Sequence, residues 1–179
     1  MRYILILLII FMSSHPASAY ENAFPKTDVG VIEIKTLPAA RLLVSRGDGD
    51  YFSENNDLFR PLFNYIQTNN IPMTTPVEAE IDPSAMYFYV SSEHSDKLLE
   101  SDPEVSVIEL PERTVLSIGV RGSYNARNFN QAKETLLAHL SEMQGWTQNG
   151  AARAIYWNGP FTLGFLKHSE VHIPVKSNN

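Results

Sequence analysis

The 179-residue chain contains no cysteine. This absence excludes disulfide bonds, thiolate metal sites, a cysteine nucleophile and a lipid-modified N-terminal cysteine. Basic residues are also scarce, because 14 Lys and Arg face 20 Asp and Glu, which gives a net charge of −6. Since nucleic-acid binding depends on a cationic surface that neutralises phosphates, we expect no nucleic-acid partner.

Long apolar runs are absent beyond the first dozen residues. The chain starts with the basic residue Arg2, continues with an apolar run over residues 3–12, and then presents an A-x-A site at 17–19. This order is typical of a secretory signal peptide, which we place at residues 1–19. A membrane-spanning helix needs about 20 apolar residues, and this run has 10. We therefore expect an exported protein, periplasmic or secreted, with no membrane span after cleavage.

The remaining chain has the composition and length of one globular domain. Hydrophobic residues make up 44% and charged residues 19% of the whole sequence, which excludes a disordered tail or a coiled coil. We divide it into an N-terminal segment at 20–29, a domain at 30–175 and a C-terminal tail at 176–179.

The hydrophobic pattern predicts two halves with the same order of elements. In the first half, strands are expected at residues 30–36, 40–45, 77–82 and 86–91. The intervening helix has one apolar face, made by Phe59, Leu62, Phe63 and Ile66. Pro61 implies that this helix either starts late, with the proline in its first turn, or kinks.

The second half repeats this order about 75 residues later. Its strands are expected at residues 104–110, 114–120, 152–157 and 170–175, with a helix at 129–143. Each amphipathic helix must bury one face on a sheet. We therefore predict an α+β fold with a pseudo-twofold repeat of two ββαββ halves.

Two segments resemble the SOUL/haem-binding protein family. Residues 62–67, followed by Met73-Thr74-Thr75-Pro76-Val77, are similar to the helix end and the K-M-T-x-P-V segment of that family. Residues 161–171 (FTLGFLKHSEV) are similar to its P-G-F-L-R-R-N-E-V segment. The resemblance covers residues 30–175 and implies a curved antiparallel sheet or distorted barrel with two long helices. In fold, the family is also similar to the small-molecule-binding domain of gyrase-inhibitory-protein-like regulators.

For function, the resemblance implies non-covalent binding of haem or another tetrapyrrole. The family's proposed axial histidine lies between a strand and a helix, but residues 46–58 contain no histidine here, so that ligand is not carried over. Pro72 replaces the lysine that precedes the M-T-x-P-V segment, and Lys167-His168 stands where the family has two basic residues.

Haem binding needs a flat apolar slot and cations for two propionates. Our candidate binding residues are Phe59, Phe63, Met73, Lys167 and His168. Each has a structural alternative: the aromatic and methionine side chains can be core packing, and the lysine and histidine can be ordinary surface residues.

No metal-binding or catalytic residue is assigned. His168 and His172 are four residues apart, which on a strand is about 13 Å, too far to share a zinc ion with bonds of about 2 Å. Glu78 and Glu80 share one face of a predicted strand, and paired carboxylates are able to perform acid–base chemistry. The favoured alternative is that they form the solvated face of an antiparallel strand.

These observations predict a noncatalytic, exported carrier or scavenger of haem or another tetrapyrrole. Two other functions stay open: a binding module for a different amphipathic or cationic small molecule, without haem, and a hydrolase that uses the same cleft. An envelope protein that binds no small ligand is the remaining alternative.

Overall fold

The computed structural model describes residues 22–98, 102–159 and 161–178. The predicted signal peptide at 1–19 lies outside this range, and so does Asn179 of the predicted tail. Within the described part of the chain, none of the helices combines the length and the apolar character needed to cross a membrane.

A curled antiparallel sheet forms the centre of the fold. Its strand order is β1-β6-β9-β8-β3-β4-β2-β5, and β7 pairs with β9 beside this path. The strands are β1 Ile32–Leu37, β2 Ala40–Arg46, β3 Val77–Glu80, β4 Ala85–Val90, β5 Ser106–Leu110, β6 Arg113–Arg121, β7 Trp146–Gln148, β8 Arg153–Tyr156 and β9 His168–Ser177.

Two long helices accompany the sheet, α1 Tyr51–Thr68 and α2 Ala126–Glu142, together with short 3-10 helices η1 Ser92–Lys97 and η2 Gly164–Leu166. The predicted α+β class, curved antiparallel sheet and two long helices are therefore confirmed. The element order follows the expected one, with β7 added, whereas a pseudo-twofold relation between the halves stays a prediction.

Helix α1 begins earlier than the apolar pattern indicated. Asp50 caps it, because its carboxylate accepts a hydrogen bond from the Ser53 amide at 3.0 Å. Pro61 consequently lies inside the helix, so the first of the two alternatives, a late start with Pro61 in the first turn, was wrong. The second, a kink at Pro61, stays a prediction. The buried face of α1 consists of Tyr51, Leu58, Leu62, Tyr65 and Ile66.

Helix α2 follows its predicted pattern. The Asn125 side chain accepts from the Asn128 amide at 2.9 Å at the start of the helix. The buried residues Phe129, Ala132, Leu136 and Leu140 form the expected apolar face. Gly145 then takes a φ of +81°, which favours glycine, and turns the chain into β7.

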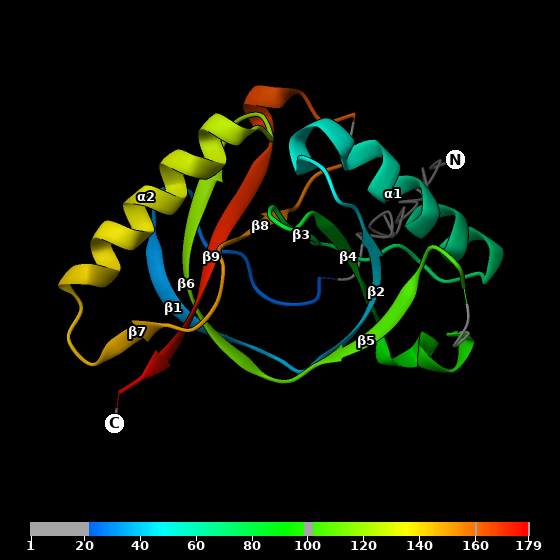
Figure 1. Ribbon diagram of the computed structural model, residues 1–179, viewed down its shortest axis with the longest axis horizontal. Coiled ribbons are helices and arrows are strands. Elements are labelled where there is room, and N and C mark those ends of the chain that lie inside the picture. Colours follow the sequence, from blue (N-terminus) through cyan, green and yellow to red (C-terminus); the bar gives the residue numbers. More distant parts are fainter. Residues whose placement is uncertain (1–21, 99–101, 160, 179) are drawn as a thin grey trace, which may run out of the picture.

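The two faces of the sheet are covered differently. Both helices lie on its outer side, and the first described residues run through the inside of the curl, in blue in Figure 1. Because successive strand side chains point to opposite faces, each strand serves both sides. On β4, for example, Phe88 belongs to the core under the helices, whereas Tyr87 and Tyr89 belong to a second core on the inner face.

The segment 22–31 closes the inner face. The ring of Phe24 is buried edge-on between Tyr89 and Trp157, with centroids 5.6 and 5.4 Å away. Gly119 on β6 permits this close approach, because a Cβ atom there would lie 2.2 Å from the carbonyl oxygen of Asp28. The inner face is therefore sealed by the chain itself.

Candidate functional site

A cavity of about 340 Å³ lies on the outer face, between the start of α1 and the chain that follows β8. Strands β3, β4 and β8 form its floor through Val77, Met86 and Tyr156. Its full lining is Tyr51, Phe52, Asn55, Asn56, Phe59, Met73, Val77, Met86, Tyr124, Tyr156, Asn158, Gly159 and Lys167. This volume is at the lower end of the range for small-molecule sites.

Three tyrosines form one wall of the cavity. The Tyr156 ring stacks on Tyr51 at 6.2 Å and packs on Tyr124 at 4.3 Å. Burial raises the pKa of Tyr51 and of Tyr156 far above the usual range, and it raises the pKa of Tyr124 to about 12. All three phenols are therefore neutral at physiological pH, and the wall is flat and uncharged.

Lys167 is the one charged side chain among the described residues that line the cavity. Its ammonium group lies 4.7 Å from the centre of the Tyr124 ring, in a cation–π contact. Within the described chain it makes no ion pair. The cavity therefore combines an apolar, aromatic interior with a positive charge that has no carboxylate partner, an arrangement that favours an amphipathic anion.

The structure brings three of the five predicted binding residues together. Phe59, Met73 and Lys167 all line the cavity. Phe63 does not line it; this side chain is 39% exposed and stacks on Phe59 with centroids 5.5 Å apart. Contact of Phe63 with a ligand stays a prediction.

His168 points elsewhere. It is the first residue of β9, and its Nε2 lies 2.9 Å from the carbonyl oxygen of Thr27 in the segment on the inner face. No histidine lines the cavity in the described part of the chain. Nor do any three histidine, aspartate or glutamate side chains gather there closely enough to hold a metal ion.

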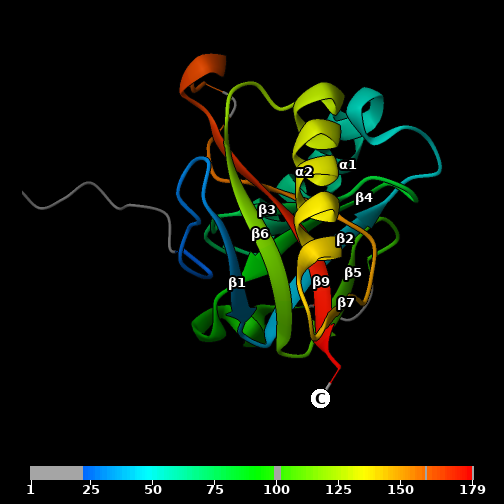
Figure 2. The same cartoon turned by 90° about the vertical axis from the view of Figure 1, so that its left-hand side faces the viewer.

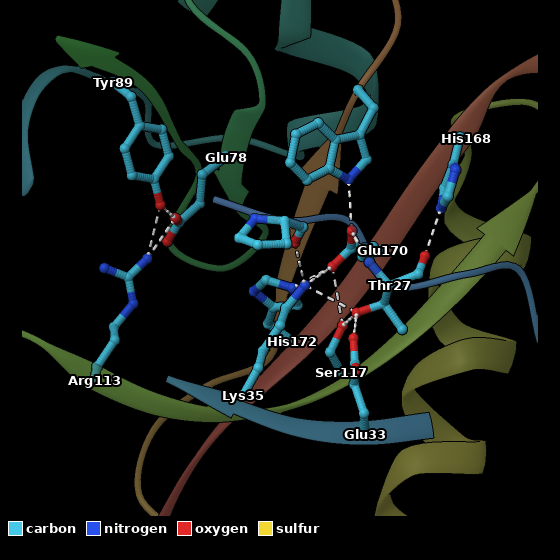
Figure 3. Close-up of polar contacts among 12 residues, drawn as sticks. Thr27, Glu33, Lys35, Glu78, Tyr89, Arg113, Ser117, His168, Glu170 and His172 are labelled. Carbon is cyan, nitrogen blue, oxygen red and sulfur yellow. Dashed lines mark hydrogen bonds and ion pairs between the residues drawn. The ribbon is translucent and has the colours of Figure 1, made fainter. Parts of the chain in front are cut away.

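The inner face holds a buried carboxylate where we expected a solvated one. Glu78 has no exposed surface and accepts hydrogen bonds from Arg113 at 2.6 Å and from the Tyr89 hydroxyl (Figure 3). Arg153 also donates to it, at 2.7 Å. Burial alone would raise its pKa, but the two arginine charges outweigh burial and hold it below its usual value. The predicted solvated face was wrong for Glu78, because side chains from β4, β6 and β8 cover it.

A second buried carboxylate, Glu170 on β9, lies at the centre of Figure 3. It is bonded to Lys35 at 2.6 Å and to His172 at 2.7 Å. Further donors are the Thr27 amide at 2.9 Å, the Ser117 hydroxyl at 3.0 Å and the Trp157 indole at 2.7 Å. Burial would raise the pKa of Glu170, but hydrogen bonds from His172 and Lys35 and the charge of Lys35 lower it to about 2.

The geometry of the Glu78 and Glu170 clusters on the inner face indicates a role in holding the fold together. Neither Glu78 nor Glu170 lines the cavity, and each is saturated by donors. A carboxylate with a lowered pKa and no solvent contact is a poor proton donor at neutral pH.

The cavity tyrosines Tyr51, Tyr124 and Tyr156 were missed by sequence reasoning, because they lie on separate elements and no local pattern joins them.

The comparisons with known proteins agree with this fold. A family model described as SOUL heme-binding protein matches residues 16–174. No curated protein matches the chain. Among solved structures, EcmrR in a complex with DNA matches with a TM-score of 0.67 at 14% identity, over 82% of this chain and 57% of that one, so this chain spans little more than half of EcmrR.

Two further structures share the fold at the same identity of 14%. SAV2435, solved bound to tetraphenylphosphonium, has a TM-score of 0.53 and is matched over 82% of this chain and 94% of its own. A hydrolase from Listeria innocua has a TM-score of 0.53, over 84% of this chain and 94% of its own. At this identity the likeness shows the fold alone.

Proposed function

Because the chain belongs to the SOUL heme-binding protein family, we propose that it binds haem or another tetrapyrrole non-covalently in the cavity beside α1. We further propose that it is exported and acts as a carrier or scavenger, without catalysis. The export proposal rests on the N-terminal pattern at residues 1–19.

The observation that carries the proposal is the pairing of an aromatic cavity with the charge of Lys167, which contacts the Tyr124 ring and has no carboxylate partner among the described residues. A tetrapyrrole is a flat apolar ring with carboxylates at one edge, and these residues fit both parts. The macrocycle is larger than the cavity, so the proposal places one edge of the ring inside it and the remainder outside. The neutral tyrosines and the absence of histidine from the described lining favour retention by packing and charge over axial ligation.

A cationic ligand is the second candidate, since SAV2435 was solved with tetraphenylphosphonium. The charge pattern of this chain disfavours it. A lipophilic cation needs a carboxylate or an unobstructed aromatic cage, but the described cavity lining has no carboxylate and already holds a cation. A hydrolase is disfavoured for a related reason, because Glu78 is ion-paired and lies on the opposite face of the sheet from the cavity.

Titration of the purified protein with hemin, followed at the Soret band, tests the proposal. We expect a saturable one-to-one change that persists when apo-albumin competes. Lys167→Ala should weaken hemin binding by about three- to tenfold, the range expected for a partly exposed charge contact. Lys133→Ala is the matched control, because Lys133 makes a similar cation–π contact with Phe129 but does not line the cavity.

A weak, non-saturating change, or complete loss to apo-albumin, would contradict haem binding. Equal affinities of the Lys167→Ala and Lys133→Ala variants would contradict the placement of the ligand. Tetraphenylphosphonium in a thermal-shift assay separates the second candidate, since a ligand that binds only the folded state raises the melting temperature. Stabilisation by this cation but not by hemin would favour the cationic alternative.

A further inference from the structure

An exposed apolar tip projects beside the cavity. Phe161 is 99% exposed, and Phe165, Leu163 and Leu166 are 68%, 60% and 49% exposed. These four residues, which we call the apolar tip, lie in and just before η2, at one end of the molecule in both ribbon views (Figures 1 and 2). Phe161, Leu163, Phe165 and Leu166 do not line the cavity.

The backbone holds this tip in an ordered, outward position. The amides of Thr162, Leu166 and Lys167 donate to carbonyl groups within the same segment, at 3.2, 2.8 and 3.2 Å. The Gly122 amide, from the loop after β6, donates to the Lys167 carbonyl at 3.0 Å. Several backbone amide and carbonyl groups of the segment therefore already have hydrogen-bond partners within the protein. A segment that enters a low-dielectric surface requires this, because unpaired backbone groups are costly there.

The charges around the tip are positive. The tip segment is residues 158–168, and the chain bonded to it runs from the last residue of β6 to the first turn of α2, residues 121–128. Together they contain Arg121, Arg127 and Lys167 but no aspartate or glutamate. This local pattern contrasts with the net charge of −6 of the whole chain. Phenylalanine and leucine flanked by arginine and lysine are typical of segments that lie in the interface of an anionic membrane.

We propose that the apolar tip docks on the surface of an anionic lipid bilayer. Phe161 and Phe165 enter the boundary between headgroups and acyl chains, and Arg121 and Arg127 contact the lipid phosphates. A lipid surface fits better than a protein partner, because a stable protein interface buries about 800 Å² on each side, more than a six-residue segment offers. The proposal goes beyond haem binding and does not depend on it.

Co-flotation with lipid vesicles tests this docking. We expect the mature protein, residues 20–179 without the apolar run of the proposed signal peptide, to float with vesicles of phosphatidylcholine and phosphatidylglycerol at about 7:3. Flotation should fall with pure phosphatidylcholine and at high salt, which screens the arginines. The double variant Phe161→Ser/Phe165→Ser should lower partitioning by at least about tenfold, since each phenylalanine loses its transfer from water.

Leu137→Ser is the matched control, because Leu137 is also an exposed apolar residue but lies about 16 Å along α2 from its first residue. It should float like the unmodified protein, and far-ultraviolet circular dichroism should be unchanged in both variants. Failure of the unmodified protein to float, or equal flotation of the double variant, would overturn the proposal.

Two other occupants of the tip give distinguishable results. If a second copy of the chain covers it, the double variant changes the oligomeric state in gel filtration and leaves flotation unchanged. If the tip closes over a bound ligand, the double variant weakens hemin binding and again leaves flotation unchanged. Either result would overturn membrane docking, while a failed hemin titration alone would leave it standing.

Discussion

The cavity and the inner face use the same strands for opposite purposes. On β3, Val77 contributes to the cavity floor, while its neighbour Glu78 enters an ion-pair cluster. On β8, Tyr156 lines the cavity and Arg153 supports Glu78. Side-chain alternation thus places an accessible apolar site and a sealed ionic layer on the two sides of one sheet.

The inner face and the cavity differ in whether their charged side chains have ionic partners. On the inner face, Glu78 and Glu170 are buried and surrounded by donors, whereas Lys167 in the cavity has no ionic partner within the described chain. Replacing a whole buried ion pair by apolar side chains often changes the stability little, whereas removing one partner of the pair is strongly destabilising. A charge held next to aromatic rings without a partner is available to a ligand.

The largest effect should come from breaking the inner-face cluster. Glu170→Ala leaves the Lys35 ammonium without its carboxylate partner, and it leaves the Thr27 amide and the Trp157 indole without their acceptor. We therefore expect the free energy of unfolding to fall by about 3–5 kcal/mol. Urea denaturation measures this change. Glu109→Ala is the control, because the pair between Glu109 and Arg41 is exposed and contributes about 1 kcal/mol or less. Similar decreases in the free energy of unfolding for Glu170→Ala and Glu109→Ala would contradict the contrast between buried and exposed ion pairs.

A pH effect of intermediate size should come from His172. Burial lowers the pKa of His172 below its ordinary value, against opposing contributions from Glu170. Between the ordinary value of about 6.5 and this lower pKa, the unfolded chain binds a proton that the folded chain does not. The free energy of unfolding should therefore decrease as the pH falls below about 6.5, by up to about 1.4 kcal/mol per pH unit.

Urea denaturation between pH 7.5 and 5 measures this slope. His172→Gln should flatten it, whereas His139→Gln should leave it unchanged, because His139 is exposed on α2. The lowered pKa of Glu170 adds a separate loss at lower pH: its stabilisation is complete above about pH 4.5 and decreases as the pH falls toward 2. The lowered pKa of Glu78 acts in the same direction. An unchanged slope in His172→Gln would contradict the assignment to this residue.

The smallest effect should come from reversing the charge of the cavity. Lys167→Glu should weaken hemin binding by about tenfold, or about 1.4 kcal/mol, and increase the thermal shift caused by tetraphenylphosphonium. The free energy of unfolding should change by less than about 0.5 kcal/mol, because Lys167 makes no ion pair within the described chain. Loss of hemin binding without any gain for the cation would indicate a general disruption of the cavity.

Much of the fold could be predicted from sequence because its signals are local. Strand alternation located β3, the 3.6-residue period located α2, and the M-T-x-P-V resemblance drew attention to Met73, which lines the cavity. That the segment 22–31 covers the inner face of the sheet could not be predicted from such local signals. Period-two alternation at Glu78 and Glu80 shows which residues share a face, but not what lies on it.

The partners that bury Glu78 are distant in sequence, with Arg113 at a separation of 35 and Arg153 at 75 residues. The cavity has the same property, because Tyr51, Tyr124 and Tyr156 meet only once the sheet has curled. Contacts between residues so far apart in sequence depend on the tertiary arrangement, and no local sequence pattern predicts them.

The place of β9 in the sheet has a consequence for how the chain reaches its native state. β9 lies between β6 and β8, although it follows both in the chain, and it carries Glu170, which bonds Thr27 across a separation of 143 residues. Until β9 inserts, the β1–β6 pair is not joined to the rest of the sheet. Such non-local pairing slows folding and leaves unpaired strand edges exposed meanwhile. Closure of the sheet therefore depends on β9, which follows the other eight strands in sequence, and the facing edges of β6 and β8 stay unpaired until it inserts.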